Sequence, residues 1–214
     1  MTLIIAVDGP AASGKGTIAA RLAQTYGLPH LDTGLLYRAV GMKVLEAGGS
    51  LDDEAAATQA ARGLDPADLS DDARLTTGEA GEAASRVAGF AGVRAALLEL
   101  QQAFAAQAGG AVLDGRDIGT VIAPKAQAKL FVTAAPEVRA TRRWKQLTAR
   151  GIEISFADML ADIQRRDDRD AGRGSAPMVQ AEDAVLLDTT DMGIEAAFDA
   201  ARRIVEAARA KHDL

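Results

Sequence analysis

A glycine-rich turn near the N-terminus constrains this chain more than any other feature. Residues 9–17 read Gly-Pro-Ala-Ala-Ser-Gly-Lys-Gly-Thr and follow a continuous apolar run from Leu3 to Asp8, which is typical of a buried parallel strand. Helical apolar spacing begins at Thr17. Glycines let backbone N–H groups converge on a polyphosphate at a helix N-terminus, and the lysine adds a positive charge. The pattern therefore predicts a phosphate-binding loop rather than an ordinary glycine-rich turn.

The loop departs from the general phosphate-loop motif at one position. Ser or Thr usually follows the lysine directly, whereas here Gly16 intervenes and the hydroxyl belongs to Thr17. The order Gly-Lys-Gly-Thr is typical of nucleoside monophosphate kinases, so it narrows the choice among P-loop proteins. The sequence has neither the guanine-reading Asn-Lys-x-Asp run of GTPases nor an ABC-type signature.

Composition excludes several other classes of protein. The 214 residues fit one compact domain, or one domain with an insertion. Without cysteine and with two histidines, the chain has no thiolate nucleophile and no Cys-based or multi-His metal site. A net charge of −6 disfavours binding to nucleic-acid polymers. No run approaches the ~20 apolar residues that span a bilayer, and the N-terminus lacks a basic signal-peptide region, so we expect a cytoplasmic protein.

Strand and helix patterns alternate along the chain. This alternation predicts an α/β fold with a five-stranded parallel sheet flanked by helices. A serine, Ser50, is expected to cap a helix, and residues 63–79 show the least regular pattern. The span 33–110 is too long for a simple crossover, which predicts a separate helical lobe. The expected strands are 3–8, 29–32, 111–114, 129–133 and 184–188, and the main expected helices are 17–26, 35–47, 82–88, 93–108, 136–150, one capped by Ser155 with Asp158, and 194–210.

Polar clusters follow the second and third expected strands, where parallel sheets bind their ligands. Asp32-Thr33-Gly34 precedes Tyr37 and Arg38, which could hold a second phosphate. A helix cap followed by a surface arginine explains this first cluster equally well. The second cluster reads Asp-Gly-Arg-Asp-Ile-Gly-Thr over residues 114–120, and packing alone does not account for so many polar groups after a buried strand.

Arginines dominate the segment from Arg139 to Arg173. It holds nine basic residues, of which eight are arginine. Arginine binds phosphate oxygens through paired hydrogen bonds and stays charged, so a mobile flap over phosphates is one interpretation. The alternative is a helix face laced by salt bridges, which Asp167 and Asp168 would serve. Taken alone, Ser85 and Arg94 look like an ordinary helix serine and a solvated arginine.

Together these segments resemble the bacterial cytidylate kinase family. The resemblance runs in order through DGPAASGKGT, LDTGLLYRAVG, ASRVAGFAGVR, DGRDIGT, RRDDRDAGR and LLDTTDMGIE, almost the whole chain. It implies a P-loop kinase fold, with a core of residues 1–32, 109–141 and 174–214. It further implies a monophosphate-binding insertion at 33–108 and a lid at 142–173. The family's insertion often carries short strands, whereas this one looks reduced and mostly helical, which bears on the contacts of Ser85 and Arg94.

The resemblance also implies a role for each matching residue. The expected ATP contacts come from the phosphate loop and the lid, and the expected catalytic residues are Lys15, Arg116, Arg142 and Arg173. Cytosine would contact Ser85, Arg94 and Asp117, and the ribose would contact Arg166 and Asp170. The acceptor phosphate would lie near Thr33, Tyr37, Arg38, Arg116 and Arg173. The expected ATP-binding residues are Gly9, Ala12, Ser13, Gly14, Lys15, Gly16, Thr17, Arg143 and Arg169.

The implied reaction moves the γ-phosphoryl group of ATP to the phosphate of CMP or dCMP. Mg²⁺ would bridge the ATP phosphates mostly through water, with Asp114 and Asp8 as candidate carboxylates outside its direct ligands. His30 is expected to be a packed strand residue. We expect a monomer whose partners are ATP and CMP or dCMP, without a nucleic-acid polymer or a membrane. The alternatives are a kinase of another small acceptor, such as AMP, UMP, shikimate or dephospho-CoA, a nucleotide-gated binding protein without turnover, and a polymer-binding P-loop protein.

Overall fold

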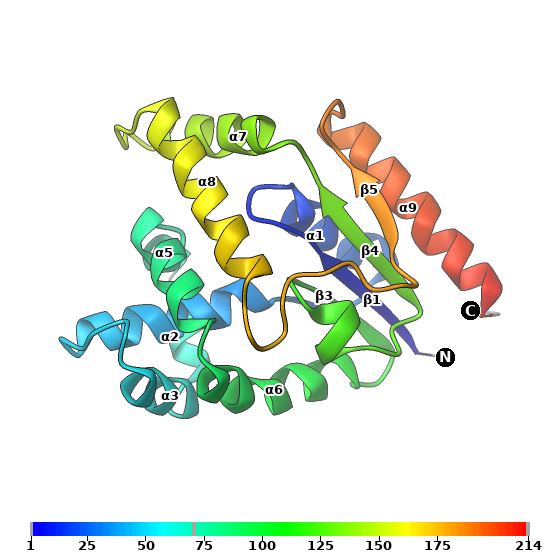
Figure 1. The fold of residues 1–214 in the computed structure, drawn as a ribbon. Coiled ribbons are helices and arrows are strands. Elements are labelled where there is room, and N and C mark those ends of the chain that lie inside the picture. Colours follow the sequence, from blue (N-terminus) through cyan, green and yellow to red (C-terminus); the bar gives the residue numbers. More distant parts are fainter. Residues whose placement is uncertain (1, 70–71, 213–214) are drawn as a thin grey trace.

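A single five-stranded sheet organises the molecule (Figure 1). The structure is a computed structural model that describes residues 2–69 and 72–212. All strand pairs are parallel, and the order is β2-β3-β1-β4-β5, which confirms the predicted sheet. The strands are β1 (Leu3–Asp8), β2 (His30–Asp32), β3 (Gly110–Gly115), β4 (Ala128–Thr133) and β5 (Val185–Asp188).

Helices cover both faces of the sheet and form the segment between β2 and β3. Each predicted helix is present, with ends shifted by a few residues. A short π-helix after β3 was not predicted. The helices are α1 (Lys15–Tyr26), α2 (Thr33–Glu46), α3 (Glu54–Arg62), η1 (Pro66–Leu69), α4 (Asp72–Leu75), α5 (Gly78–Val87), α6 (Ala91–Ala105), η2 (Ile118–Ile122), α7 (Pro136–Thr148), α8 (Phe156–Ala171) and α9 (Ile194–Lys211).

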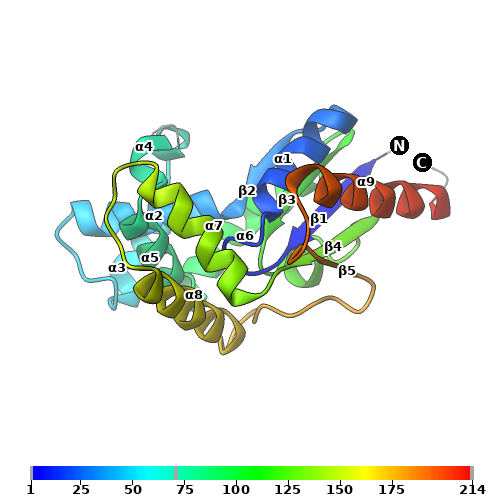
Figure 2. The same cartoon turned by 90° about the horizontal axis from the view of Figure 1, so that it is seen from above.

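The two faces of the sheet bury different partners. Helices α1 and α9 pack together on one face (Figure 2), where Leu22 and Val205 meet side chains such as Val7. On the other face, Leu113 packs against Ile118 of η2 and against the end of α6. Because β1 lies in the middle of the sheet, Ile5, Ala6 and Val7 are fully buried, as a strand apolar on both faces requires.

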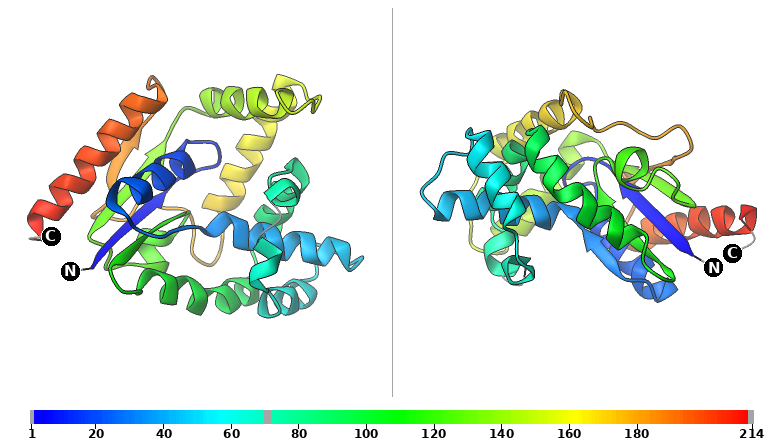
Figure 3. Two further views of the ribbon diagram at one scale, coloured as in Figure 1. Left: turned by 180° about the vertical axis from the view of Figure 1, so that it is seen from behind. Right: turned by 90° about the horizontal axis from the view of Figure 1, so that it is seen from below.

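The insertion between β2 and β3 has its own apolar core. Leu36, Ala83 and Leu97 belong to one buried cluster that joins α2, α3, α5 and α6. Figure 3 shows these helices at one end of the sheet, away from the chain termini. The described residues of the insertion form no strand, in line with the predicted helical lobe.

Two local predictions in the insertion are wrong. Ser50 does not cap α3; its hydroxyl accepts a hydrogen bond from the Asp52 amide within a turn, and Asp53 caps the helix by accepting from Ala56 N at 3.0 Å. Residues 63–79, predicted to be the least regular, contain η1, α4 and the start of α5. Residues 70 and 71 of that stretch lie outside the described residues.

The helical hairpin of α7 and α8 stands over the phosphate loop. Ala140, Leu147, Met159 and Ile163 form its buried core, against which Ala11 and Ala12 pack. As predicted, Ser155 caps α8 by accepting from Asp158 N at 3.0 Å. Among residues 2–69 and 72–212, no helix is both long and apolar enough to cross a membrane.

Two adjacent glycines, one just before β3 and one at its first residue, give a test of this packing. Both have positive φ, +87° at Gly109 and +99° at Gly110, but only a Cβ on Gly110 would meet Leu3 O, at 2.0 Å. We expect Gly109→Ala to cost about 1 kcal/mol of unfolding free energy, from φ alone. Gly110→Ala should cost about 3 kcal/mol or more, because it also forces β3 from β1. Urea unfolding followed by circular dichroism measures both, and equal losses would contradict the strand packing.

Candidate active site

The predicted phosphate loop connects β1 to α1 with backbone that favours glycine. Gly14 adopts φ +92° and stands at the N-cap of α1, so the helix amides meet no capping side chain there. Gly9 is buried at φ +145°, and a Cβ on it would lie 1.9 Å from Val132 O. Gly9 therefore lets the loop leave β1 against β4, while Gly14 opens the helix end to an anion.

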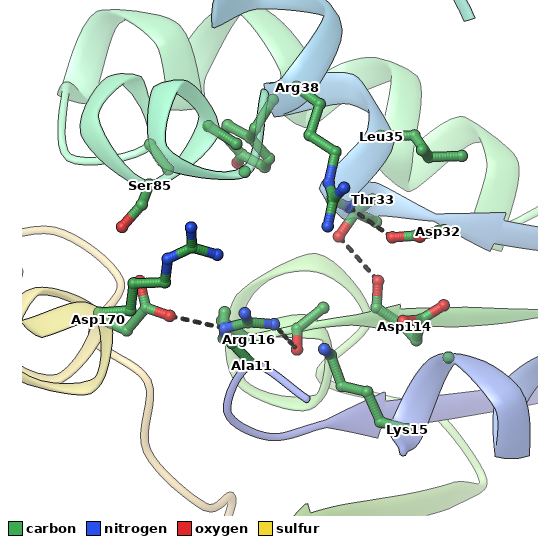
Figure 4. A pocket seen from close by; sticks show the side chains of 18 of the residues that line it. Ala11, Lys15, Asp32, Thr33, Leu35, Arg38, Ser85, Asp114, Arg116 and Asp170 are labelled. Carbon is green, nitrogen blue, oxygen red and sulfur yellow. Dashed lines mark hydrogen bonds and ion pairs between the residues drawn. The ribbon is translucent and has the colours of Figure 1, made fainter. Parts of the chain in front are cut away.

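Lys15 extends from the first turn of α1 into a polar pocket (Figure 4). Burial lowers the pKa of Lys15 to about 8, and nearby Arg116 acts in the same direction. Asp114 and Asp32 oppose that shift. A bound phosphate would stabilise the charged form of such a buried lysine, because its negative charge offsets the hydration that burial removes.

The pocket lies where the carboxyl ends of β2 and β3 meet the insertion and α8. Its volume is about 330 Å³. Seven cations and four carboxylates line it, so it carries an excess of positive charge although the chain is acidic overall. The cations are Lys15, Arg38, Arg94, Arg116, Arg143, Arg166 and Arg173, and the carboxylates are Asp32, Asp114, Asp117 and Asp170.

A buried ion pair between Arg94 and Asp117 closes one end of the pocket. Arg94 comes from α6 and Asp117 from the turn after β3, and both side chains are more than nine-tenths buried. Tyr37 lies beside them, with its ring 5.8 Å from the Arg94 guanidinium. Burial raises the pKa of Asp117 despite Arg94 and Arg173. Arg94 is therefore not the solvated arginine that its helix position alone suggests.

Unpaired polar atoms face the same pocket. The buried Oγ of Ser85 and Nε of Arg173 have no hydrogen-bond partner among the described residues. Buried polar atoms are seldom left unpaired, so these atoms mark a place where a polar ligand would complete the hydrogen bonds. The structure thus brings Ser85 and Arg94 to the pocket that the resemblance implied.

Asp170 joins the end of α8 to the turn after β3. Arg116 Nε donates to Asp170 Oδ2 at 2.7 Å, and Arg173 pairs with Oδ1. Although Asp170 is buried, these two arginines hold its pKa below the usual range. Asp170 therefore positions both predicted catalytic arginines of the pocket.

Three other cations, Arg38, Arg143 and Arg166, line the pocket. Arg38 donates to Leu75 O at 2.8 Å, and Arg166 is paired with Asp162. Burial lowers the pKa of Arg143 to about 10, and Arg38 and Arg166 add to that shift. Arg143, which the resemblance assigned to ATP, thus lies near Arg38 and Arg166, which the resemblance assigned to the acceptor phosphate and to the ribose. Thr33 donates from Oγ1 to Asp114 O at 2.8 Å.

The structure also places the remaining predicted residues of the phosphate loop and of α7 and α8. Arg142 donates to Ser13 O, at 3.3 Å, and to Thr189 O, at 2.7 Å, so it ties α7 to the phosphate loop and to the segment after β5. The Ser13 side chain is fully buried. Arg169 pairs with Glu82 of α5 at 2.8 Å, which links α8 to the insertion. Thr17 is exposed on α1 and Gly16 lines the pocket.

Asp8, predicted as a candidate outer metal carboxylate, holds the turn after β3. Its two oxygens accept from Ile118 N at 2.8 Å and from Gly119 N at 2.7 Å. Burial raises its pKa to about 6. Asp8 therefore anchors the start of η2, next to Asp117.

Sequence reasoning missed two contacts that shape the site. Arg139 is buried, pairs with Asp167 of α8 at 2.5 Å, and donates to Ala11 O of the phosphate loop at 3.3 Å. His30, expected to be a packed strand residue, lies 2.7 Å from Asp114 through Nε2. An arginine at the start of a helix and a histidine before LDTG were the only sequence signals for them.

The pocket fits a magnesium ion that arrives with nucleotide phosphates. No group of three or more His, Cys, Asp or Glu among the described residues could hold a metal by itself. Two carboxylates, Asp32 and Asp114, do line the pocket beside the phosphate loop. Mg²⁺ keeps several waters and commonly binds through one or two carboxylates plus substrate phosphates, which matches this donor set.

Comparison with known proteins places the chain in a family. A family model described as cytidylate kinase matches residues 5–207. The chain is 66% identical to the cytidylate kinase of Caulobacter vibrioides (strain NA1000 / CB15N), covering 100% of both. It is 67% identical to that of Xanthobacter autotrophicus over 208 residues, 97% of this chain and 99% of the other. The chain belongs to the cytidylate kinase family. This confirms the resemblance noted in the sequence.

Solved structures support the fold of this cytidylate kinase family member. An uncharacterized protein from Eubacterium ventriosum matches with a TM-score of 0.57 and 14% identity, covering 97% of this chain and 99% of that one. A sugar kinase from Janibacter sp. HTCC2649 matches with a TM-score of 0.52 and 16% identity, covering 98% of both. At these identities the likeness concerns the fold alone.

The lowered pKa of Lys15 predicts a specific pH dependence. Lys15 carries its charge below about pH 8 and loses it above. We expect kcat/KM for ATP to fall tenfold per pH unit above about pH 8, because kcat/KM follows the free protein. The fall in kcat should occur at higher pH, since bound phosphates raise the pKa of Lys15 and keep it charged. A profile of kcat/KM that stays flat to pH 10, with circular dichroism unchanged, would contradict the role of Lys15.

Proposed function

We propose that this chain transfers the γ-phosphoryl group of ATP directly, in line, to the phosphate of CMP and of dCMP. Membership of the cytidylate kinase family supports the reaction class. One observation carries the rest. A single pocket joins Lys15 of the phosphate loop to the buried Arg94–Asp117 pair, with further arginines between them. Two phosphorylated ligands can meet only where both ends of such a site share one cavity.

In the proposed complex, the phosphate loop holds the ATP polyphosphate. The residues Gly9, Ala12, Ser13, Gly14, Lys15, Gly16 and Thr17 shape it. Arg143 and Arg169 would join the ATP phosphates only if closure of the lid moved them from their places beside Arg38 and Arg166 and against Glu82. Backbone amides at the start of α1 face the phosphates, and Lys15 adds a charge that its pocket leaves unsatisfied. When bound, Mg²⁺ would neutralise phosphate charge, with Asp114 reaching it through water.

Catalysis then requires charge stabilisation and alignment. We assign Lys15, Arg116 and Arg173 to the transferring group, and Arg142 to the loop that holds the donor. Asp170 fixes two of these arginines, so their guanidinium groups are set before the substrates bind. A monophosphate has a second pKa near ~6 and is largely dianionic at neutral pH, so the acceptor needs no general base.

The acceptor end of the pocket matches the hydrogen-bonding groups of cytosine. Thr33, Tyr37 and Arg38 would receive the phosphate of CMP. Asp117 and Ser85 would accept from the N4 amine of cytosine, and Arg94 would donate to N3 and O2. Uracil would place an oxygen against Asp117, which leaves buried groups unpaired and favours cytosine.

The ribose contacts predict that dCMP is accepted. The resemblance places Arg166 and Asp170 at the ribose. Both oxygens of Asp170 already accept hydrogen bonds from Arg116 and Arg173. Removal of the 2′-hydroxyl would therefore leave no buried charge unpaired, and its cost should be small.

We further propose that residues 142–173 act as a lid over a core of residues 1–32, 109–141 and 174–214, with 33–108 as the monophosphate-binding insertion. The Arg169–Glu82 pair between α8 and α5 supports contact between lid and insertion. Closure would exclude water, which otherwise competes for the phosphoryl group. We also propose that the chain acts on small nucleotides as a cytoplasmic monomer.

Two substitutions at the base end test this function. Asp117→Ala should raise KM for CMP about a hundredfold and Ser85→Ala about tenfold, because each removes an acceptor for the N4 amine of cytosine. KM for ATP should change less than threefold. Initial rates in a coupled ADP-release assay measure both constants.

Asp168→Ala serves as the control, because Asp168 is an exposed carboxylate on α8, and it should leave KM for CMP unchanged. Loss of Asp117 leaves Arg94 buried without its partner, so thermal unfolding must show that the variant is folded; Ser85→Ala avoids that problem. Equal losses for CMP and ATP would contradict base recognition. Binding of ATP without turnover on any acceptor would instead favour a nucleotide-gated binding protein.

A further inference from the structure

His30 contacts the active-site carboxylate Asp114 from the edge of the sheet. It begins β2 at the sheet's outer edge, and its Nε2 lies 2.7 Å from Asp114 Oδ1. The His30 side chain is 24% exposed, whereas that of Asp114 is 2% exposed. Because the carboxylate can only accept, the imidazole donates from Nε2 whether it is neutral or protonated. The pair joins residues 84 positions apart.

The other contacts of Asp114 leave one oxygen for the phosphate loop. Its backbone oxygen accepts from Thr33 Oγ1 at 2.8 Å, and Oδ1 faces His30. Oδ2 lies 3.6 Å from the position that a Cβ on Gly16 would take. His30 therefore holds one oxygen of the carboxylate, and the second points to the start of α1 beside Lys15.

Charge near Asp114 makes this hydrogen bond important. Asp32 lies opposite Asp114 in the register of β2 and β3. Two carboxylates at neighbouring positions repel each other, and both burial and the nearby Asp114 raise the pKa of Asp32. A donor on Oδ1 offsets part of that repulsion and opposes rotation of the Asp114 side chain away from the loop.

We propose that His30 is a positioning residue that holds Asp114 toward the phosphate loop for binding of the magnesium–nucleotide complex. This rests on the proposed function, in which Asp114 reaches Mg²⁺ through water. Partners that orient metal-site carboxylates commonly change metal affinity by about 10–100-fold when they are lost. Since His30 acts through Asp114 and water, we expect a change of about tenfold, at the low end of that range.

The test compares two substitutions of similar size. His30→Met removes the donor, and His30→Gln retains one. Isothermal titration calorimetry with ADP in Mg²⁺ and with ADP in EDTA separates the metal-dependent part of binding. We expect His30→Met to weaken binding of Mg–ADP about tenfold and to leave binding of ADP in EDTA within twofold. His30→Gln should recover most of the loss.

The other histidine of the chain provides a matched control. His212 is exposed at the end of α9, and His212→Met should bind both forms of ADP as the parent does. In an Asp114→Asn background, His30→Met should have little further effect, because the two residues act together.

Three outcomes would overturn the proposal. These are unchanged binding of Mg–ADP in His30→Met, an equal loss with and without Mg²⁺, and a full additional loss in the Asp114→Asn background. A structural role alone would lower the melting temperature without changing the metal-dependent part. If the parent binds Mg–ADP but phosphorylates no monophosphate, the proposed function fails, while the binding data still decide the role of His30.

Discussion

Seven cations converge on one pocket at the carboxyl edge of the sheet, in a chain whose net charge is negative. Like charges repel at such distances, and burial adds a desolvation cost. The lowered pKa values of Lys15, Arg38 and Arg143 record that cost. The buried sheet and its helices must supply enough stability to hold these groups in place, and nucleotide phosphates would supply the missing negative charge.

Buried carboxylates pair with these cations and thereby link elements that lie far apart in the sequence. Asp170 connects Arg116 after β3 to Arg173 after α8, and Asp117 connects the same turn to Arg94 of α6. Asp8, at the end of β1, holds the start of η2 by accepting hydrogen bonds from two of its backbone amides. The arginines are thus preorganised by pairs that bring the core, the insertion and α8 together, and such preorganisation is how fixed charges stabilise phosphoryl transfer.

Much of the fold follows from local sequence patterns. The apolar run before Gly9 and the alternation of strands and helices predict the parallel sheet, because burial on both faces requires that pattern. Capping depends on finer geometry. Ser50 and Asp53 are both good caps, and the structure places the N-cap at Asp53, three residues after Ser50. The two short helices between residues 63 and 79 are held by tertiary contacts, such as the Lys43–Asp68 pair, that local patterns do not reveal.

The site residues likewise fall into those that sequence motifs predict and those that they do not. Residues in contiguous motifs, such as Lys15 and the cluster at 114–117, could be predicted because each motif combines spacing with chemistry. Arg94 and His30 could not be placed by spacing, since their importance comes from partners 23 and 84 residues away. For Arg94 the family resemblance supplied what local reasoning lacked. For His30 only the structure shows the contact with Asp114.

The central claim is that one end of the charged pocket recognises cytosine and the other holds ATP. The most direct measurement is kcat/KM for CMP, UMP and AMP with saturating ATP, in a coupled assay of ADP release. Recognition through Asp117 and Arg94 predicts that CMP exceeds UMP and AMP by about a hundredfold or more. Equal or better use of UMP or AMP would contradict it.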